Sequence, residues 1–231
     1  MELLSCGDLT IEGRLVDASN ITLYCSVRLA SRSASCVYKP VQGERPLWDF
    51  PDGTLAEREV AAYLLSAATG WELIPPTVLR ENGPFGRGMV QLWVDVDERV
   101  DVGELIGTDD PTLRRMAVFD AVVNNGDRKG GHLLPMPDGH VYGVDHGICF
   151  APQDKLRTVL WRWAGDPLPG DARAMLAGLD DDLKGPLGDA LGELLTRREV
   201  LAVTRRAQRV LRSGRHPQPS GNWPPVPWPP F

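Results

Sequence analysis

Two aspartates stand in the part of the sequence best suited to phosphoryl chemistry. Asp127 follows an apolar stretch and is surrounded by glycines, and Asp145 follows a short apolar run and precedes Gly147. Phosphoryl transfer needs a ligand for the metal ion that accompanies the nucleotide phosphates and a carboxylate that orients the acceptor hydroxyl. Two aspartates joined by a turn can converge on one cleft. Taken alone, each is more typical of a turn, because Asp–Gly neighbourhoods favour turns.

A lysine within an apolar strand is the second chemical signal. Lys39 follows the apolar residues 36–38. Burying its ammonium group without a partner would be costly, so we expect a carboxylate or a phosphate beside it. Glu59 is the candidate carboxylate, since Glu57 is expected to cap a helix. The alternative is a lysine whose charged end reaches solvent at the end of the strand.

Alternating apolar and polar residues predict the strands that carry these groups. Residues 9–29 alternate on both sides of a turn at 17–20 and predict a β-hairpin. A short strand is expected at 35–39. Further strands are predicted at 88–96 and 141–144, where apolar residues again alternate or cluster between loops.

Helix signals are of two kinds. Thr54 and Glu57 have capping-box spacing and predict the start of a helix at 55–68. Residues 113–125 are apolar nearly all round, which predicts a buried helix. Two more helices should close the domain, and the second is expected to begin with a capping box at Thr196.

The order of elements predicts an α+β fold of two small lobes. We expect a mainly β lobe at 1–94 that binds nucleotide, and a mainly helical lobe at 95–215 with a cleft between them. Residues 216–231 are rich in proline and tryptophan and predict a polyproline II tail. This tail could dock on the body or on a partner, or remain mobile, and the sequence favours neither.

Five segments carry further information in the order in which they occur. They are VYKPVQGERP, REVAAYLL, GMVQLW, FDAVVNNGDRKGGHLL and YGVDHGICF. These segments resemble the type II phosphatidylinositol 4-kinases and their bacterial relatives, and the whole resembles the PI3/PI4-kinase-related proteins of actinobacteria. This resemblance implies a small two-lobed protein-kinase-like fold. It also implies transfer of the γ-phosphate of ATP to a hydroxyl acceptor, with Mg²⁺ or Mn²⁺.

The resemblance also implies roles for individual residues. Lys39 would bind the α/β-phosphates and Glu59 would orient it. Asp127, followed by Arg128, would act on the acceptor hydroxyl, and Asp145 would hold the metal ion. The remaining nucleotide-binding positions implied are Ser19, Asn20, Val37, Gln91, Leu92, Trp93 and Val94.

The sequence departs from the family pattern at the second metal position. His132 stands where the family usually has asparagine, and imidazole suits Mg²⁺ less well than an amide oxygen. Either His132 contacts a phosphate or the second metal ion is bound weakly. The hairpin loop is not strongly glycine-rich, and few residues follow Asp145. Phosphoinositide specificity therefore does not carry over well.

Three functions remain open. The first is a kinase for a small hydroxylated metabolite, a lipid head group or a protein. The second is a nucleotide-binding regulatory protein without transfer activity, and the third is a nucleotidyl transferase. The presence of Lys39, Glu59, Asp127 and Asp145 together favours the first.

Composition excludes several classes of protein. The net charge of −6 argues against a general nucleic-acid binder. No apolar run reaches the ~18 residues of a transmembrane helix, and the first residues do not resemble a signal peptide, so we expect a cytoplasmic protein. The four cysteines are not at zinc-ligand spacing.

Overall fold

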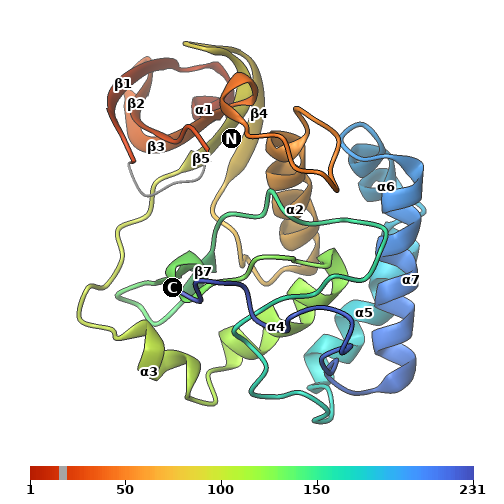
Figure 1. Ribbon diagram of the computed structural model, residues 1–231. Helices are drawn as coiled ribbons and strands as arrows, with labels where there is room; N and C mark the ends of the chain where they lie inside the picture. The colour runs from red at the N-terminus through yellow and green to blue at the C-terminus, as the bar shows by residue number, and fades with distance from the viewer. Residues whose placement is uncertain (16–19) are drawn as a thin grey trace.

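A five-stranded antiparallel sheet forms most of the N-terminal part of the molecule (Figure 1). The computed structural model describes residues 1–15 and 20–231. The strand order is β1-β2-β3-β5-β4, so the two strands of the predicted hairpin are confirmed, and β1 forms one edge of the sheet. The turn predicted at 17–20 lies, except for its last residue, outside the described residues. The five strands are β1 (Asp8–Arg14), β2 (Leu23–Leu29), β3 (Arg32–Pro40), β4 (Thr77–Gly83) and β5 (Gly86–Leu92).

Two helices accompany the sheet. The short helix α1 (Glu2–Cys6) contributes Leu4 to the core of the sheet. The longer helix α2 (Leu55–Thr69) packs its buried Val60 against Met89 of β5. Helix α2 ends at Gly70, which has a φ of 69° in the left-handed region that glycine adopts without strain. Helix α2 therefore packs against the sheet, and it also contacts the C-terminal part of the chain.

The start of α2 differs from the sequence-based expectation. The carboxylate of Glu44 accepts hydrogen bonds from the backbone N–H groups of Leu55 (3.0 Å) and Ala56 (2.8 Å). Thr54 instead donates its hydroxyl to the carbonyl of Pro51, and Glu57 forms an ion pair with Arg87. The predicted Thr54–Glu57 capping box is therefore wrong. A carboxylate from the preceding loop reaches the donors that it would have satisfied.

The C-terminal part is mainly helical. As predicted, α4 is buried almost all round, from Leu113 to Val123, and α7 begins with a capping box between Thr196 and Glu199. Three helices rather than two close the chain. The elements are α3 (Val102–Ile106), α4 (Pro111–Val123), β6 (Leu133–Pro135), β7 (Val141–Gly143), α5 (Gly170–Asp182), α6 (Pro186–Gly192) and α7 (Arg197–Ser213).

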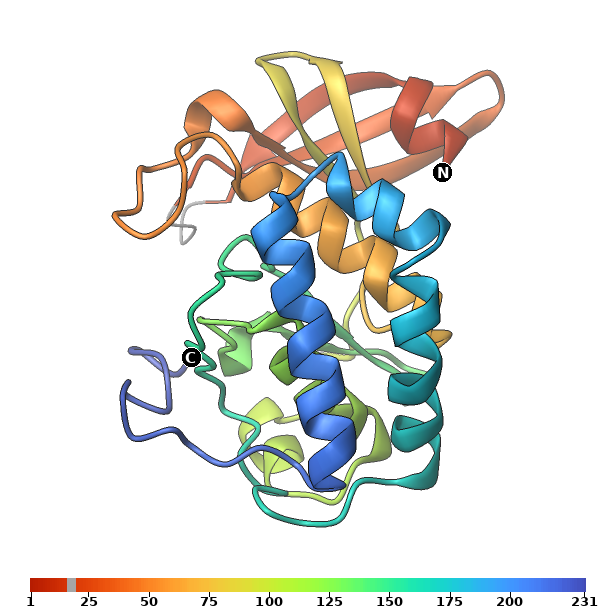
Figure 2. The same ribbon diagram turned by 90° about the vertical axis from the view of Figure 1, so that its right-hand side faces the viewer.

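Helix α2 is joined to the C-terminal part by a buried ion pair. Arg58 donates to the carboxylate of Glu199 on α7 at 2.5 Å and to the carbonyl of Cys149 at 2.9 Å. In Figure 2 the N-terminal part of α7 passes in front of α2, and the sheet lies above both helices. Because α2 contacts both the sheet and α7, it helps to fix the position of the sheet relative to the C-terminal part.

The tail, residues 216–231, packs on the C-terminal part of the molecule. It forms no helix or strand, and the carbonyl of Pro225 accepts a hydrogen bond from the backbone of Thr158. Of the two alternatives that the sequence left open, the structure therefore has the docked tail. Within the described residues, no helix has both the length and the apolar character needed to cross a membrane.

Candidate functional site

A cavity of about 520 Å³ lies between the sheet and the helical part. Its walls include Lys39 of β3, Glu59 of α2 and Gln91 of β5 on one side, and Asp127 and Asp145 on the other. This volume is within the ~300–1,000 Å³ range of ligand pockets in proteins. The cavity therefore gathers residues that lie far apart in the sequence.

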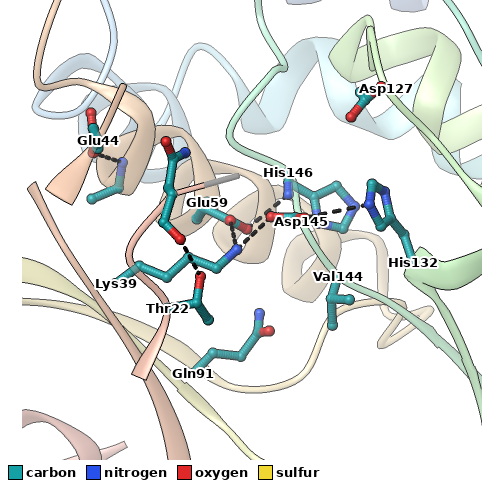
Figure 3. Close-up of polar contacts among 12 residues, drawn as sticks. Thr22, Lys39, Glu44, Glu59, Gln91, Asp127, His132, Val144, Asp145 and His146 are labelled. Carbon is teal, nitrogen blue, oxygen red and sulfur yellow. Dashed lines mark hydrogen bonds and ion pairs between the residues drawn. The ribbon is translucent and has the colours of Figure 1, made fainter. Parts of the chain in front are cut away.

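Lys39 is the centre of a charged network on one wall (Figure 3). Its Nζ donates to Oε1 of Glu59 at 2.7 Å and to Oδ1 of Asp145 at 2.5 Å. Burial lowers the pKa of Lys39, but the carboxylates of Asp145 and Glu59 outweigh it and raise the pKa above its ordinary value. The ammonium group is therefore charged and directed into the cavity between two carboxylates.

Glu59 links the network to the segment that carries Asp145. Its second oxygen, Oε2, accepts the backbone N–H of His146 at 2.8 Å. Asp145 itself has a φ of 63°, in the left-handed region that non-glycine residues seldom adopt. Such strain persists where the surroundings over-determine the backbone, and it clusters at functional sites. The contact with Glu59 is one of those that hold the strained residue.

His132 lies on the other side of Asp145. Its Nε2 is 3.4 Å from Oδ2 of Asp145, and its Nδ1 accepts the backbone N–H of Lys129 at 3.4 Å. Burial lowers the pKa of His132 to about 4, so the ring is neutral at pH 7. A neutral ring that accepts at Nδ1 carries its proton on Nε2. His132 thus presents an N–H, not a lone pair, to Asp145.

Asp127 is held by the backbone of its own loop, residues 124–132, called the Asp127 loop below. The side-chain oxygen of Asn125 accepts the backbone N–H of Asp127 at 2.9 Å, and Asn125 in turn donates to Asp120. Nζ of Lys129 lies 3.7 Å from the Asp127 carboxylate. Burial raises the pKa of Asp127, although Lys129 opposes the shift. The carboxylate is therefore a better proton acceptor than a solvated aspartate.

Arg128 does not reach the cavity. Its fully buried guanidinium donates to both oxygens of Asp120 at 3.0 Å, to the carbonyl of Val144 and to Nε2 of His146. We expected from the sequence that Arg128 acts on the acceptor, but its side chain is buried away from the cavity and this geometry does not support that role. Arg128 positions the backbone that carries Asp145, while its neighbour Asp127 faces the cavity.

The expected nucleotide-binding residues fall on the cavity wall wherever the structure describes them. Ser19 lies outside the described residues. The Gln91 amide is turned into the sheet, where it donates to Thr77. The backbone N–H of Val94 has no hydrogen-bond partner within residues 1–15 and 20–231 and is free to meet a ligand. The wall residues are Asn20, Val37, Lys39, Glu59, Gln91, Leu92, Trp93 and Val94.

The donor set at Asp145 fits a magnesium ion that brings its own phosphate ligands. The described residues contain no group of three His, Cys, Asp or Glu side chains that could hold a metal ion. Mg²⁺ commonly takes one or two protein carboxylates and completes its shell with phosphates and water. The Asp145 side chain is 51% exposed and can serve as such a ligand. His132, with its proton facing Asp145, does not fit as a second ligand in this arrangement.

Several residues of the site were missed from the sequence. Asn125 and Asp120 shape the Asp127 loop, and His146 accepts from Arg128. Glu44 caps α2 at the edge of the cavity. Lys129, two residues after Asp127, could have been found from its charge and its place in the same glycine-rich loop. The others act through contacts that no local pattern encodes.

Two curated relatives are similar to this chain, whereas no model of a known protein family matches it. Protein Rv2133c of Mycobacterium tuberculosis (strain ATCC 25618 / H37Rv) is 47% identical over 264 aligned residues, which cover 99% of this chain and 94% of that protein. Phosphatidylinositol 4-kinase gamma 4 of Oryza sativa subsp. japonica is 27% identical over 151 residues, 56% of this chain and 27% of that protein.

Solved kinase structures share the fold. The structure of hydra Fam20 with sugar gives a TM-score of 0.60 at 15% identity, covering 92% of this chain and 86% of that one. The Golgi casein kinase gives 0.55 at 13% identity, covering 91% and 73%. The Helicobacter pylori proinflammatory kinase CtkA gives 0.55 at 10% identity, covering 92% and 94%. The chain therefore has a kinase-like fold. The narrower likeness to type II phosphatidylinositol 4-kinases is not shown by these structures.

Proposed function

Because this chain belongs to the same protein family as Protein Rv2133c of Mycobacterium tuberculosis and has a kinase-like fold, we propose that it is an ATP-dependent phosphotransferase. It would transfer the γ-phosphate of Mg-ATP to a hydroxyl acceptor. One observation carries this proposal: Lys39 lies between the carboxylates of Glu59 and Asp145 on one wall of a cavity that Asp127 also lines. Fold alone does not fix function, so the proposal rests on this site.

The charged network suits a nucleotide triphosphate. Lys39 would bind the phosphates as a fixed positive charge, and Glu59 would keep its ammonium group in place. The backbone N–H of Val94, which has no hydrogen-bond partner among the described residues, would meet the edge of the base. Val37, on the cavity wall, would give the base an apolar surface.

Asp127 would receive the proton of the acceptor hydroxyl. Its raised pKa brings it closer to the operating pH, which improves a general base. Lys129, 3.7 Å away, would balance negative charge that gathers on the transferred group. Both side chains come from the Asp127 loop, so their positions depend on how firmly that loop is held.

The metal site would use Asp145. A bound Mg²⁺ would supply positive charge at the phosphates and lower their repulsion toward an incoming oxygen. Asp145, whose Oδ1 meets Lys39 and whose Oδ2 faces His132, would hold this ion through its carboxylate. The strained backbone at Asp145, held by Glu59 through His146, would fix that orientation.

The acceptor class remains open between a small hydroxylated metabolite, a lipid head group and a protein. A phosphoinositide is the narrower form of this proposal, supported by the sequence resemblance and by the 27% identity to a phosphatidylinositol 4-kinase over 56% of the chain. An unbiased screen of metabolites and lipids with the purified protein and γ-labelled ATP is the direct way to find it.

One observation favours a second candidate, a nucleotide-binding protein without transfer activity. The N–H of His132 faces Asp145, so the second metal position of active kinases has no oxygen ligand there. The variant His132→Asn supplies an amide oxygen. It should leave transfer unchanged or raise it if the proposed kinase activity exists, and should create none if the chain only binds nucleotide.

Labelled ATP separates the possible functions. The proposed activity predicts transfer of label from γ-labelled ATP and none from α-labelled ATP. Transfer of the α-label instead would identify a nucleotidyl transferase. Tight Mg-ATP binding with no transfer of either label to any fraction of the screened acceptors, or to water, would support the binding protein. Failure to bind millimolar Mg-ATP would overturn the proposal.

A further inference from the structure

The tail lies beside the Asp127 loop. Figure 2 shows it running from the lower end of α7 to the side of the molecule on which the loop between β3 and α2 also lies. The carbonyl of Pro225 accepts the backbone N–H of Thr158 at 3.0 Å and the indole N–H of Trp161 at 2.8 Å. The tail is therefore held to the segment around Thr158 by one main-chain hydrogen bond and by the indole N–H of Trp161.

The segment covered by the tail is itself hydrogen-bonded to the Asp127 loop. The backbone N–H of Arg128 donates to the carbonyl of Arg157 at 3.1 Å, and the N–H of Val159 donates to the carbonyl of Arg128 at 3.1 Å. Thr158 thus has the tail on one side and Arg128 on the other. Only the segment 157–159 therefore separates this part of the tail from the backbone of Arg128, next to Asp127.

The end of the tail also contacts the Asp127 loop directly. The backbone N–H of Gly130 donates to the carbonyl of Pro230 at 2.8 Å. A Cβ atom on Gly130 would lie 2.1 Å from the ring of Phe231, which is too close for any side chain. The φ of Gly130 is not in the left-handed region, so glycine is required here for space and not for conformation. The Phe231 ring fills the place of the missing side chain.

We propose that Pro230 and Phe231 are positioning residues for the Asp127 loop. Gly130 and Gly131 have no side chains with which to pack, yet they connect Asp127 and Lys129 to His132. The Phe231 ring and the Pro230 carbonyl hold this glycine turn in place. The tail thereby sets the position of the Asp127 carboxylate relative to the cavity. This inference rests on the proposed phosphotransferase function for its effect on turnover, but not for its effect on the loop.

The variant Phe231→Ala tests the proposal, with Trp228→Ala as its matched control in the same tail. The Trp228 side chain is 86% exposed, against 61% for Phe231, and it makes no hydrogen bond to the Asp127 loop among the described residues. We expect Phe231→Ala to lower γ-phosphate release to acceptor or water about tenfold or more, because small displacements of a reacting group are costly. The Kd for Mg-ATP should stay within about twofold, since the tail does not line the cavity. Phe231→Tyr, which keeps the ring, should retain wild-type turnover.

Hydrogen exchange gives a readout that does not depend on activity. Amides of residues 124–132 should exchange faster in Phe231→Ala than in the wild type or in Trp228→Ala, while those of β3 and β5 should not change. If Phe231→Ala and Trp228→Ala exchange alike in residues 124–132, the positioning role is wrong. If exchange rises but no variant and no wild-type protein transfers phosphate, the proposed function is wrong and the loop contact stands.

A reciprocal pair of variants tests the contact itself. Gly130→Ala places a methyl group against the Phe231 ring and should loosen the same amides and lower turnover. In Gly130→Ala/Phe231→Ala the methyl group has room, so Gly130→Ala should add little to the loss that Phe231→Ala already causes. A double variant as impaired as the sum of the two single variants would overturn the assigned contact.

Discussion

At the scale of single residues, Asp127 and Asp145 differ in what their carboxylates touch. Asp145 is bound by Lys39, which holds its pKa below the ordinary value, and lies 3.4 Å from His132. The Asp127 carboxylate lies 3.7 Å from Nζ of Lys129, and burial raises its pKa. One carboxylate is therefore suited to remain ionised and bind cations, and the other to take up a proton.

This difference predicts two distinct losses of function. Asp145→Asn removes a charged oxygen, so Mg-dependent nucleotide affinity and turnover should fall together. Asp127→Asn should leave the Kd for Mg-ATP nearly unchanged while transfer falls about 10²–10⁴-fold, the scale of losing a general base. ATP titrations with and without Mg²⁺, beside γ-phosphate transfer, measure both. Wild-type turnover in both variants would show that neither carboxylate has its proposed role.

At the scale of elements, α2 shows how a helix can be capped from outside its own sequence. The Thr54–Glu57 spacing satisfies the local rule, but Glu44 occupies the first backbone donors of the helix. The same loop places Asp49 2.5 Å from Lys155 of the C-terminal part. The helix start is therefore defined by how residues 41–54 fold.

Substitutions at the start of α2 should reflect this arrangement. Glu44→Ala leaves two backbone N–H groups without their carboxylate and should lower the free energy of unfolding by about 1–2 kcal/mol. Thr54→Ala, in the same turn, should cost less, because its hydroxyl makes no bond to the helix backbone. Urea unfolding of the two variants measures the difference. A larger loss for Thr54→Ala would favour the local capping box after all.

The elements that local patterns predicted are those with a clear period or composition. The hairpin, the buried helix α4 and the Thr196 capping box of α7 follow from such patterns. The strand expected at 88–96 ends at Leu92, because the backbone leaves the sheet there to line the cavity. Strand β4, helices α1 and α3 and strand β6 were missed, since each is short or has no regular alternation.

The candidate site divides in the same way. Lys39, Glu59, Asp127 and Asp145 could be chosen from the sequence because their types and neighbours are unusual and because motifs with a known order surround them. The orientation of Arg128 could not, since its burial depends on Asp120 eight residues earlier and on His146. The contact of Phe231 with Gly130 joins residues too distant for any sequence window.

At the scale of the whole molecule, the sheet and the helical part are held together by charges buried in their contact. Arg58 of α2 bonds Glu199 of α7 at 2.5 Å with both side chains almost fully buried. Arg58→Ala would leave the Glu199 carboxylate buried without its cation and should lower the free energy of unfolding by about 3–5 kcal/mol. Arg205→Ala, exposed on the same helix as Glu199, is the control. Equal losses in chemical denaturation would show that the pair does not join the two parts.

Ligand binding across the two parts should stabilise the whole fold. A ligand that binds only the native state adds RT ln(1 + [L]/Kd), about 2.7 kcal/mol at one hundred times Kd, so Mg-ATP should raise the Tm. Lys39→Met removes the cation expected to meet the phosphates and should abolish most of this shift. Glu59 keeps the backbone N–H of His146 as a partner, so the variant should still fold without nucleotide.

Lys184→Met, at an exposed lysine of the helical part, should keep the full shift. A full shift in Lys39→Met would mean that nucleotide binds without Lys39, and a wild type without any shift at millimolar Mg-ATP would mean that the cavity serves another ligand.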